Sequence, residues 1–270
     1  MLERELGVLL FVRRSRGVTL TEAGALLLRR SEHVLRTVEQ LKAEVGDLNG
    51  EPRGTIRIGC TPGLTAPLVS EALRSFMSRC PNVKVHLQEH TSEALHKLVL
   101  AEDLELAVLS EREPHPEIES THLFDEPIYL FGPPFALHAD EKVDLKDIGG
   151  LRLILARRSL TTREAIERLL SSAGVSSSII METDSIGAIA HLVQSGLGFT
   201  VAPFLSLQER AGQGLMSYAQ IRDFSIRRVI IRRRDTWVTR GLQSFMDLVV
   251  AAADHNNGLT SWRLSPSMKR

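Results

Sequence analysis

The 270-residue sequence predicts an α/β protein in which two similar lobes follow one long helix. Three observations support this prediction. Residues 20–48 carry apolar side chains at heptad spacing, residues 54–109 alternate between strand and helix patterns, and residues 127–202 repeat that alternation. Two α/β lobes of this kind enclose a cleft at the carboxyl ends of their strands, where ligands bind.

The composition is that of an ordinary globular protein, with 43% hydrophobic and 24% charged residues. Thirty-three basic residues balance 33 acidic ones, which excludes a uniformly basic nucleic-acid coat but not a local basic patch. Cys60 and Cys80 form no CxxC pair, and the first ten residues include Glu3, Arg4 and Glu5. We therefore expect a cytoplasmic protein without a secretory signal or a membrane span.

The first predicted element is the long helix. Thr19 or Thr21 caps its start, Glu22 stands in its first turn, and it runs to about Leu48. A helix packed only on its own domain is one interpretation, but its length and narrow apolar seam favour pairing with a second copy. The seam residues that we assign to dimerisation are Leu27, Val34, Val38, Leu41, Val45 and Leu48.

Residues 49–54 (NGEPRG) end this helix and predict a hinge. Beyond it, strands and helices alternate, which predicts parallel, doubly wound strands in each lobe. No periodicity is visible from Asn256 onward. The expected strands are 55–59, 83–89, 104–109, 127–132, 152–155, 179–182, 199–202 and 226–232, and the expected helices are 65–79, 92–100, 162–172, 186–195 and 239–253.

Several runs resemble the LysR-type family of transcriptional regulators. Residues 6–24 (LGVLLFVRRSRGVTLTEAG) resemble the family's LG-x-x-LF-x-R segment and the LT-x-AG that follows it. Residues 54–59 (GTIRIG), 104–108 (LELAV) and 192–198 (LVQSGLG) resemble motifs of its sensor domain, with Glu105 in place of the usual Asp. The similarity covers residues 2–253, and residues 87–95 and 182–186 are most similar to the nitrogen assimilation control subgroup.

The resemblance implies a fold in three parts. A partial winged helix-turn-helix takes residues 1–20, a dimerisation helix takes residues 21–50, and a two-lobed periplasmic-binding-protein-like effector domain follows. Lobe I would comprise residues 54–127 and 232–256, lobe II residues 128–231, and residues 257–270 would form a tail.

The N-terminus departs from the family pattern. Residues 2–7 (LERELG) resemble the end of the recognition helix, and only Met1 precedes them. A recognition helix makes its base contacts from its N-terminal part, so sequence-specific binding to promoter DNA is expected to need the earlier helices. Either the start codon is misassigned or the chain is a truncated form.

Arg13, Arg14 and Arg16 stand at the tip of a predicted hairpin beside Gly17. In the family this wing contacts phosphates or the minor groove, which gives salt-dependent affinity without sequence choice. A solvated basic turn is the other interpretation of these three residues.

The resemblance also implies an effector site at strand-to-helix junctions. Free backbone N–H groups at helix starts hold carboxylate, phosphate or sulfate, so a small polar or anionic effector is expected. Plain helix capping by the same hydroxyl groups is the alternative. The candidate effector contacts are Thr61, Gly63, Leu64, Thr91, Ser92, Ser159, Thr161, Thr162 and Ala202.

These observations predict a LysR-type regulator, active as a homodimer or homotetramer, in which an effector closes the lobes and changes promoter contact. The chain contains no GxSxG, HExxH or GxxxxGK[ST] motif, and His86, His90 and His96 do not share one face. We therefore expect neither an enzyme nor a metal or other cofactor. The alternative is a two-lobed small-ligand-binding protein without DNA binding, although residues 8–48 have no place in such a protein.

Overall fold

The computed structural model describes residues 1–47, 52–157, 161–176 and 178–258. The N-terminal part is a short helix, α1 (Leu2–Leu6), and a hairpin of β1 (Phe11–Arg14) and β2 (Gly17–Leu20). The Glu3 carboxylate accepts a hydrogen bond from the backbone N–H of Leu10 at 2.6 Å, which ties the helix to the hairpin. The hairpin predicted around Arg13–Gly17 is thus present.

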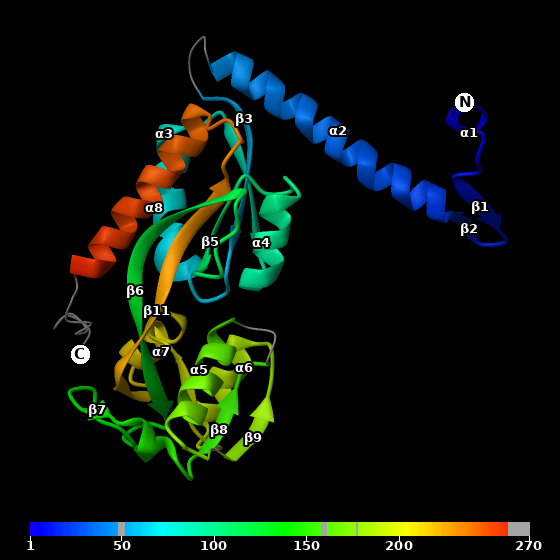
Figure 1. Ribbon diagram of the computed structural model, residues 1–270. Helices are drawn as coiled ribbons and strands as arrows, with labels where there is room; N and C mark the ends of the chain where they lie inside the picture. The colour runs from blue at the N-terminus through cyan, green and yellow to red at the C-terminus, as the bar shows by residue number, and fades with distance from the viewer. Residues whose placement is uncertain (48–51, 158–160, 177, 259–270) are drawn as a thin grey trace.

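The long helix α2 (Glu22–Asp47) projects away from the two lobes (Figure 1). Thr21 caps it, because its Oγ1 accepts a hydrogen bond from Gly24 N at 2.9 Å. A side chain at position 24 could not fit, since its Cβ would lie 2.0 Å from the carbonyl oxygen of Leu10. In its C-terminal half, α2 is tied to lobe I by an ion pair of 3.1 Å between Glu39 and Arg57.

Lobe I is built on three parallel strands in the order β4 (Val83–Glu89), β3 (Gly54–Cys60) and β5 (Leu106–Ser110). Their covering helices are η1 (Thr65–Val69), which is a π-helical turn, α3 (Ser70–Arg79), α4 (Ser92–Leu100) and α8 (Arg240–Gly258). Phe76 of α3 meets Phe245 of α8 edge to face at 5.6 Å in the core. The last helix that the structure describes, α8, therefore completes the first lobe.

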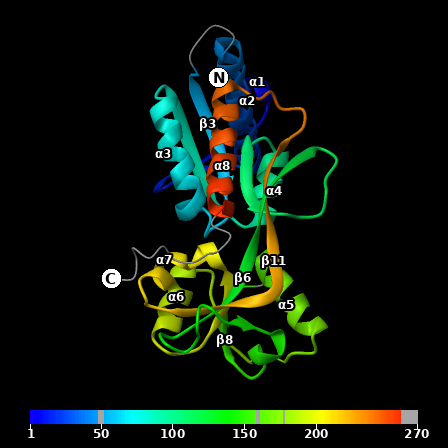
Figure 2. The ribbon, with the colours of Figure 1, turned by 90° about the vertical axis from the view of Figure 1, so that its left-hand side faces the viewer.

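Two long antiparallel strands, β6 (Ile118–Gly132) and β11 (Ser217–Arg233), run through both lobes (Figures 1 and 2). The sheet order is β10-β6-β11-β5-β3-β4. The three strands predicted between residues 54 and 109 are parallel as expected, but the sheet as a whole is mixed, because β11 returns from lobe II and pairs with β5 in the antiparallel direction. The strands expected at 127–132 and 226–232 are only parts of β6 and β11.

Lobe II contains β8 (Arg152–Leu155), α5 (Thr161–Ser172), β9 (Ser178–Glu182), α6 (Ile186–Gln194) and β10 (Thr200–Pro203). It also has four short elements that the sequence pattern did not predict. These are β7 (Lys142–Val143), η2 (Leu145–Ile148), η3 (Phe204–Ser206) and α7 (Gln208–Gly212). Part of its core is a cluster of aromatic rings: Tyr129, Phe131, Phe204 and Tyr218.

The C-terminal helix is longer than the sequence pattern indicated. It was expected to end at Ala253, but α8 continues to Gly258, so the first residues of the expected tail are helical. Leu48, the hinge residues 49–51 and the rest of the tail lie outside the described residues. Among the helices that the structure describes, none has the length and apolar character needed to span a membrane.

Candidate functional site

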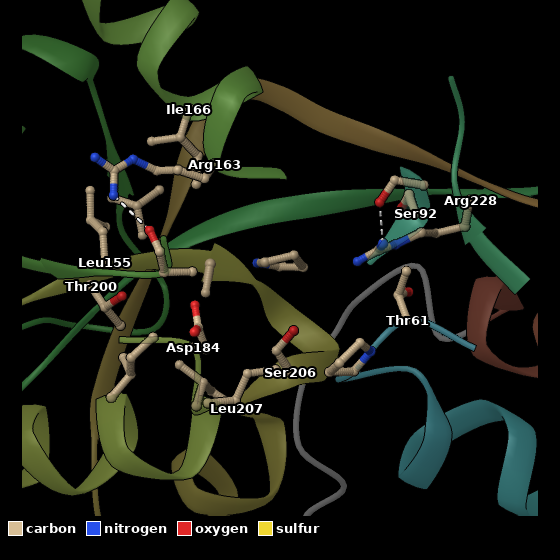
Figure 3. A pocket seen from close by; sticks show the side chains of 18 residues that line it. Thr61, Ser92, Leu155, Arg163, Ile166, Asp184, Thr200, Ser206, Leu207 and Arg228 are labelled. Atoms are coloured by element: carbon tan, nitrogen blue, oxygen red, sulfur yellow. Dashed lines mark hydrogen bonds between the residues drawn. The ribbon is translucent and has the colours of Figure 1, made fainter. Parts of the chain in front are cut away.

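A cavity of about 100 Å³ lies between the two lobes (Figure 3). Lobe I and the crossing strand β11 supply its polar end, through Thr61, Pro62, Ser92, Ser110 and Arg228. Lobe II supplies the larger part of the wall: Leu155, Ala156, Arg163, Ile166, Asp184, Ile186, Ile189, Thr200, Val201, Ala202, Pro203, Ser206 and Leu207. The cavity is therefore closed by both lobes together.

A buried ion pair stands at the polar end. Nε of Arg228 on β11 donates to Oε2 of Glu126 on β6 at 2.6 Å, and Nη1 donates to Oγ of Ser110 at 2.5 Å. Arg228 is 3% exposed and Glu126 is fully buried. Oε1 of Glu126 accepts a hydrogen bond from the backbone N–H of Leu205 at 2.9 Å. The pair thus connects both crossing strands to the η3 turn of lobe II.

Thr61 and Ser92 lie beside this ion pair. Thr61 follows the end of β3, and its backbone N–H donates to the carbonyl of Val108 at 3.0 Å. Its Oγ1 is buried and has no hydrogen-bond partner among the described residues. Ser92 is buried at the first position of α4, where Thr91 caps the helix by accepting from Ala94 N at 3.2 Å. Both polar side chains therefore occur where a strand or helix meets the cavity.

The lobe II end is mainly aliphatic. Arg163 is the cation among the described lobe II residues of the lining. It is 1% exposed, and its positive charge is balanced by neighbouring carboxylates. Its Nη1 donates to the carbonyl of Ala156 at 2.7 Å, and its Nη2 pairs with Glu167 at 2.6 Å and Glu182 at 3.0 Å. Asp184, the acidic residue of this wall, is paired with Arg157. The lobe II wall thus presents apolar surface and neutralised charges.

Only some of the predicted effector contacts line the cavity. Thr61, Ser92 and Ala202 line the cavity, whereas Thr91 is the cap of α4 and Leu64 is fully buried in the lobe I core. Gly63 has φ +94 and lies against Ser206 of the other lobe. Ser159 lies outside the described residues, as do the side chains of Thr161 and Thr162, which open α5.

Sequence reasoning missed Arg228, Glu126 and Ser110. The available signal was a charged residue at the start of each of two apolar runs, DEPIYLF around Glu126 and RRVII around Arg228. A charge in such a place needs a buried partner. The sequence did not show that these two residues, 102 positions apart, are partners of each other.

The candidate DNA-binding and dimerisation residues lie outside the lobes. Arg13, Arg14 and Arg16 are all exposed on the hairpin, and Leu27 is half-buried on α2. The remaining seam residues in the described part of α2 are exposed: Val34 by 59%, Val38 by 42%, Leu41 by 57% and Val45 by 55%. A row of exposed apolar side chains along one helix is typical of a surface that pairs with another helix.

Together, the cavity between two lobes and the projecting helix with its hairpin define a two-lobed ligand-binding architecture that carries a helical extension. The family model of the LysR substrate binding domain matches residues 49–254. This chain belongs to the LysR-type family of transcriptional regulators.

The curated relatives carry names of transcriptional regulators. The nitrogen assimilation regulatory protein nac of Klebsiella aerogenes is 34% identical over 203 residues, which are 75% of this chain and 66% of that protein. A probable RuBisCO transcriptional regulator of Porphyra purpurea is 32% identical over 238 residues, 85% of this chain and 74% of that protein. The names of these relatives are those of regulators and not of enzymes.

Solved structures share the fold. CbnR, crystallised full-length with its target DNA, matches with a TM-score of 0.73 and 20% identity over 93% of this chain and 86% of that chain. The effector binding domain of QuiR, in complex with shikimate, matches with a TM-score of 0.65 and 16% identity over 75% of this chain and 98% of that chain.

Proposed function

We propose that this LysR-type regulator senses a small polar or anionic effector in the cavity between its lobes and transmits binding to promoter DNA. The observation that carries the proposal is that both lobes wall the cavity. A ligand that contacts both walls stabilises one arrangement of the lobes over others, and that differential affinity is what shifts a conformational equilibrium. Action on promoter DNA would place the protein in the cytoplasm.

Within the cavity, we assign effector contact to Thr61, Ser92 and Ala202. Their support is that all three belong to the lining. Thr91 and Gly63 would act by positioning, Thr91 through its cap of α4 and Gly63 through its close approach to Ser206. Ser159, Thr161 and Thr162 stay predictions of the sequence, and Leu64 would serve packing alone.

We further propose that the hairpin contacts DNA phosphates through Arg13, Arg14 and Arg16, and that α2 pairs with α2 of a second copy. The exposure of the three guanidinium groups and of the α2 seam supports this assignment. Such phosphate contacts would give affinity that depends on salt and not on base sequence.

Fluorescence anisotropy of a labelled duplex at several salt concentrations tests the DNA assignment. Changing Arg13, Arg14 and Arg16 together to Gln should flatten the dependence of log affinity on log salt by about 0.9 for each phosphate that the variant no longer neutralises. Lys146→Gln, an exposed change on lobe II, is the matched control and should leave the dependence unchanged.

The second candidate function, a ligand-binding protein without DNA binding, makes the opposite prediction. The native chain would then show no salt-dependent affinity for the duplex at low salt, while still binding a small anion. The regulator proposal makes a further prediction. If a ligand changes the affinity of the protein for DNA by some factor, then DNA must change the affinity for that ligand by the same factor, because coupling between two binding sites is reciprocal.

A further inference from the structure

The polar end of the cavity holds a buried cation whose hydrogen-bonding capacity is only partly used. A guanidinium carries five N–H donors. Arg228 uses Nε on Glu126 and one N–H of Nη1 on Ser110. Within the part of the chain that the structure describes, its Nη2 donates to no acceptor. Figure 3 shows Arg228 at the same end of the cavity as Thr61 and Ser92.

Thr61 supplies a second, independent observation. Its side chain is more than nine-tenths buried, and its Oγ1 has no partner among the described residues. Buried hydroxyl groups are nearly always hydrogen-bonded in folded proteins, so an orphaned one that lines a cavity is a group that a ligand there can satisfy. An acceptor placed there would satisfy both the Thr61 hydroxyl and the unused donors of Arg228.

The charge at this end limits what the acceptor can be. Glu126 already compensates Arg228, so the pair carries no net charge. The start of α4 at Ser92 adds only the partial positive charge of a helix N-terminus. One negative charge spread over two oxygens suits two or three donors and a helix dipole. A divalent oxyanion would bring a second charge with nothing to balance it.

The other end of the cavity limits the rest of the ligand. Leu155, Ile166 and Val201 are buried aliphatic side chains in its wall. Arg163, the cation there, is held by Glu167 and Glu182 and so has no charge to spare for a second anionic group. A cavity of about 100 Å³ accepts a compact body of a few carbon atoms.

We infer that the effector is a small monocarboxylate with a compact aliphatic body. Its carboxylate binds Arg228 and Thr61, and its body lies against the aliphatic wall of lobe II. Arg228 and Thr61 thereby determine the chemical class of the effector. The inference rests on the proposed function, because it concerns the same cavity.

Calorimetric titration of the full chain at neutral pH tests the inference, with 3-methylbutanoate, 3-methylbutanamide and sulfate as probes. The acid and the amide have nearly the same shape and differ in charge. We expect the acid to bind about ten-fold more tightly than the amide, and sulfate to bind more weakly than the acid.

Three variants test which side chains give the preference for the acid over the amide. Thr61→Val removes the orphaned hydroxyl at nearly constant shape and should reduce the acid-over-amide ratio several-fold. Thr121→Val makes the same change at an exposed position of β6 outside the lining and should leave that ratio unchanged. The double variant Arg228→Met, Glu126→Leu removes both members of the ion pair, avoids a lone buried charge and should abolish the ratio.

The inference would be overturned by equal affinity for acid and amide, by an acid-over-amide ratio that Thr61→Val leaves intact, or by no binding of either probe at about 10 mM. Sulfate binding as tight as that of the acid, lost in Thr61→Val, would assign the site to inorganic anions and likewise overturn it. None of these results touches the salt-dependent DNA binding that tests the regulator itself, so the two failures are distinguishable.

Discussion

At the scale of single residues, the buried Arg228–Glu126 ion pair is where the loss of one charge should affect stability most. Both side chains are almost completely buried, and each compensates the charge of the other. Breaking such a pair leaves one unbalanced charge in the interior, whereas replacing both partners with apolar groups of similar size is often neutral. The pair therefore costs little while intact and much when half of it is removed.

Arg228→Met should lower the free energy of unfolding by about 3–5 kcal/mol, because Glu126 stays buried without its cation. Urea denaturation followed by circular dichroism measures the loss. Adding Glu126→Leu to the variant should restore most of the stability. A single variant as stable as the native chain would show that water reaches Glu126 in solution.

A second prediction concerns Cys60, which is fully buried at the end of β3. Burial raises the pKa of its thiol to about 12. At pH 8 only about one part in ten thousand would then be the reactive thiolate. Iodoacetamide should leave Cys60 unlabelled in the native chain and label it in urea, as mass spectrometry of the peptides would show. Rapid labelling without denaturant would contradict the burial.

The residues of the site divide clearly by how far the sequence could predict them. Thr61 and Ser92 were predictable because each stands at a strand end or helix start, a place that sequence pattern can locate. Arg228, Glu126 and Ser110 were not, because their roles depend on which strands lie side by side. Ser110 lies opposite Arg228 in the β5–β11 pairing, and the two residues are 118 positions apart in the chain.

At the scale of elements, the exposed apolar seam of α2 predicts that the chain assembles through this helix. Leu41→Asp should convert the assembled chain to monomer, because it places a charge in the apolar surface that two helices would share. Lys42→Asp introduces the same residue one position away, on an exposed polar site, and serves as the control. Sedimentation at micromolar concentration distinguishes the two variants, and unchanged assembly of Leu41→Asp would refute pairing through this seam.

Elements with strong local patterns were the predictable ones. The helix from Glu22 to Asp47 was found from its heptad spacing, and the sequence left Thr19 and Thr21 as alternative caps, of which the structure shows Thr21. The outer halves of β6 and β11 were not found, because runs such as ESTH at 119–122 carry no strand pattern of their own. Each missed half is a strand because it pairs with the predicted half of the other one: residues 118–126 of β6 pair with residues 226–233 of β11, and residues 217–220 of β11 pair with residues 129–132 of β6.

At the scale of the whole molecule, contact between the lobes depends on Gly63. A Cβ at this position would lie 2.5 Å from Oγ of Ser206 in lobe II, and the φ of +94 is unfavourable for any other residue. Gly63 thus allows the loop after β3 to approach the opposite lobe closely, next to the cavity.

Gly63→Ala should lower stability by about 1–3 kcal/mol and loosen the contact between the lobes, through strain and collision together. Gly150→Ala separates the two effects, because Gly150 has φ +81 but nothing within 4 Å of its added Cβ. Urea denaturation measures stability, and small-angle scattering measures lobe separation. If the two variants lose the same free energy of unfolding and show the same lobe separation in scattering, the approach of Ser206 has no role in holding the lobes together.

The position of α8 has a consequence for how the chain matures during synthesis. Residues 128–231 of lobe II are contiguous and leave the ribosome before Phe245, on which the core of lobe I depends. Domains fold as units once their residues are available. Lobe II can therefore form while the strands of lobe I still lack their last covering helix, and a nascent chain stopped before α8 would present the apolar face of α3 to chaperones and proteases.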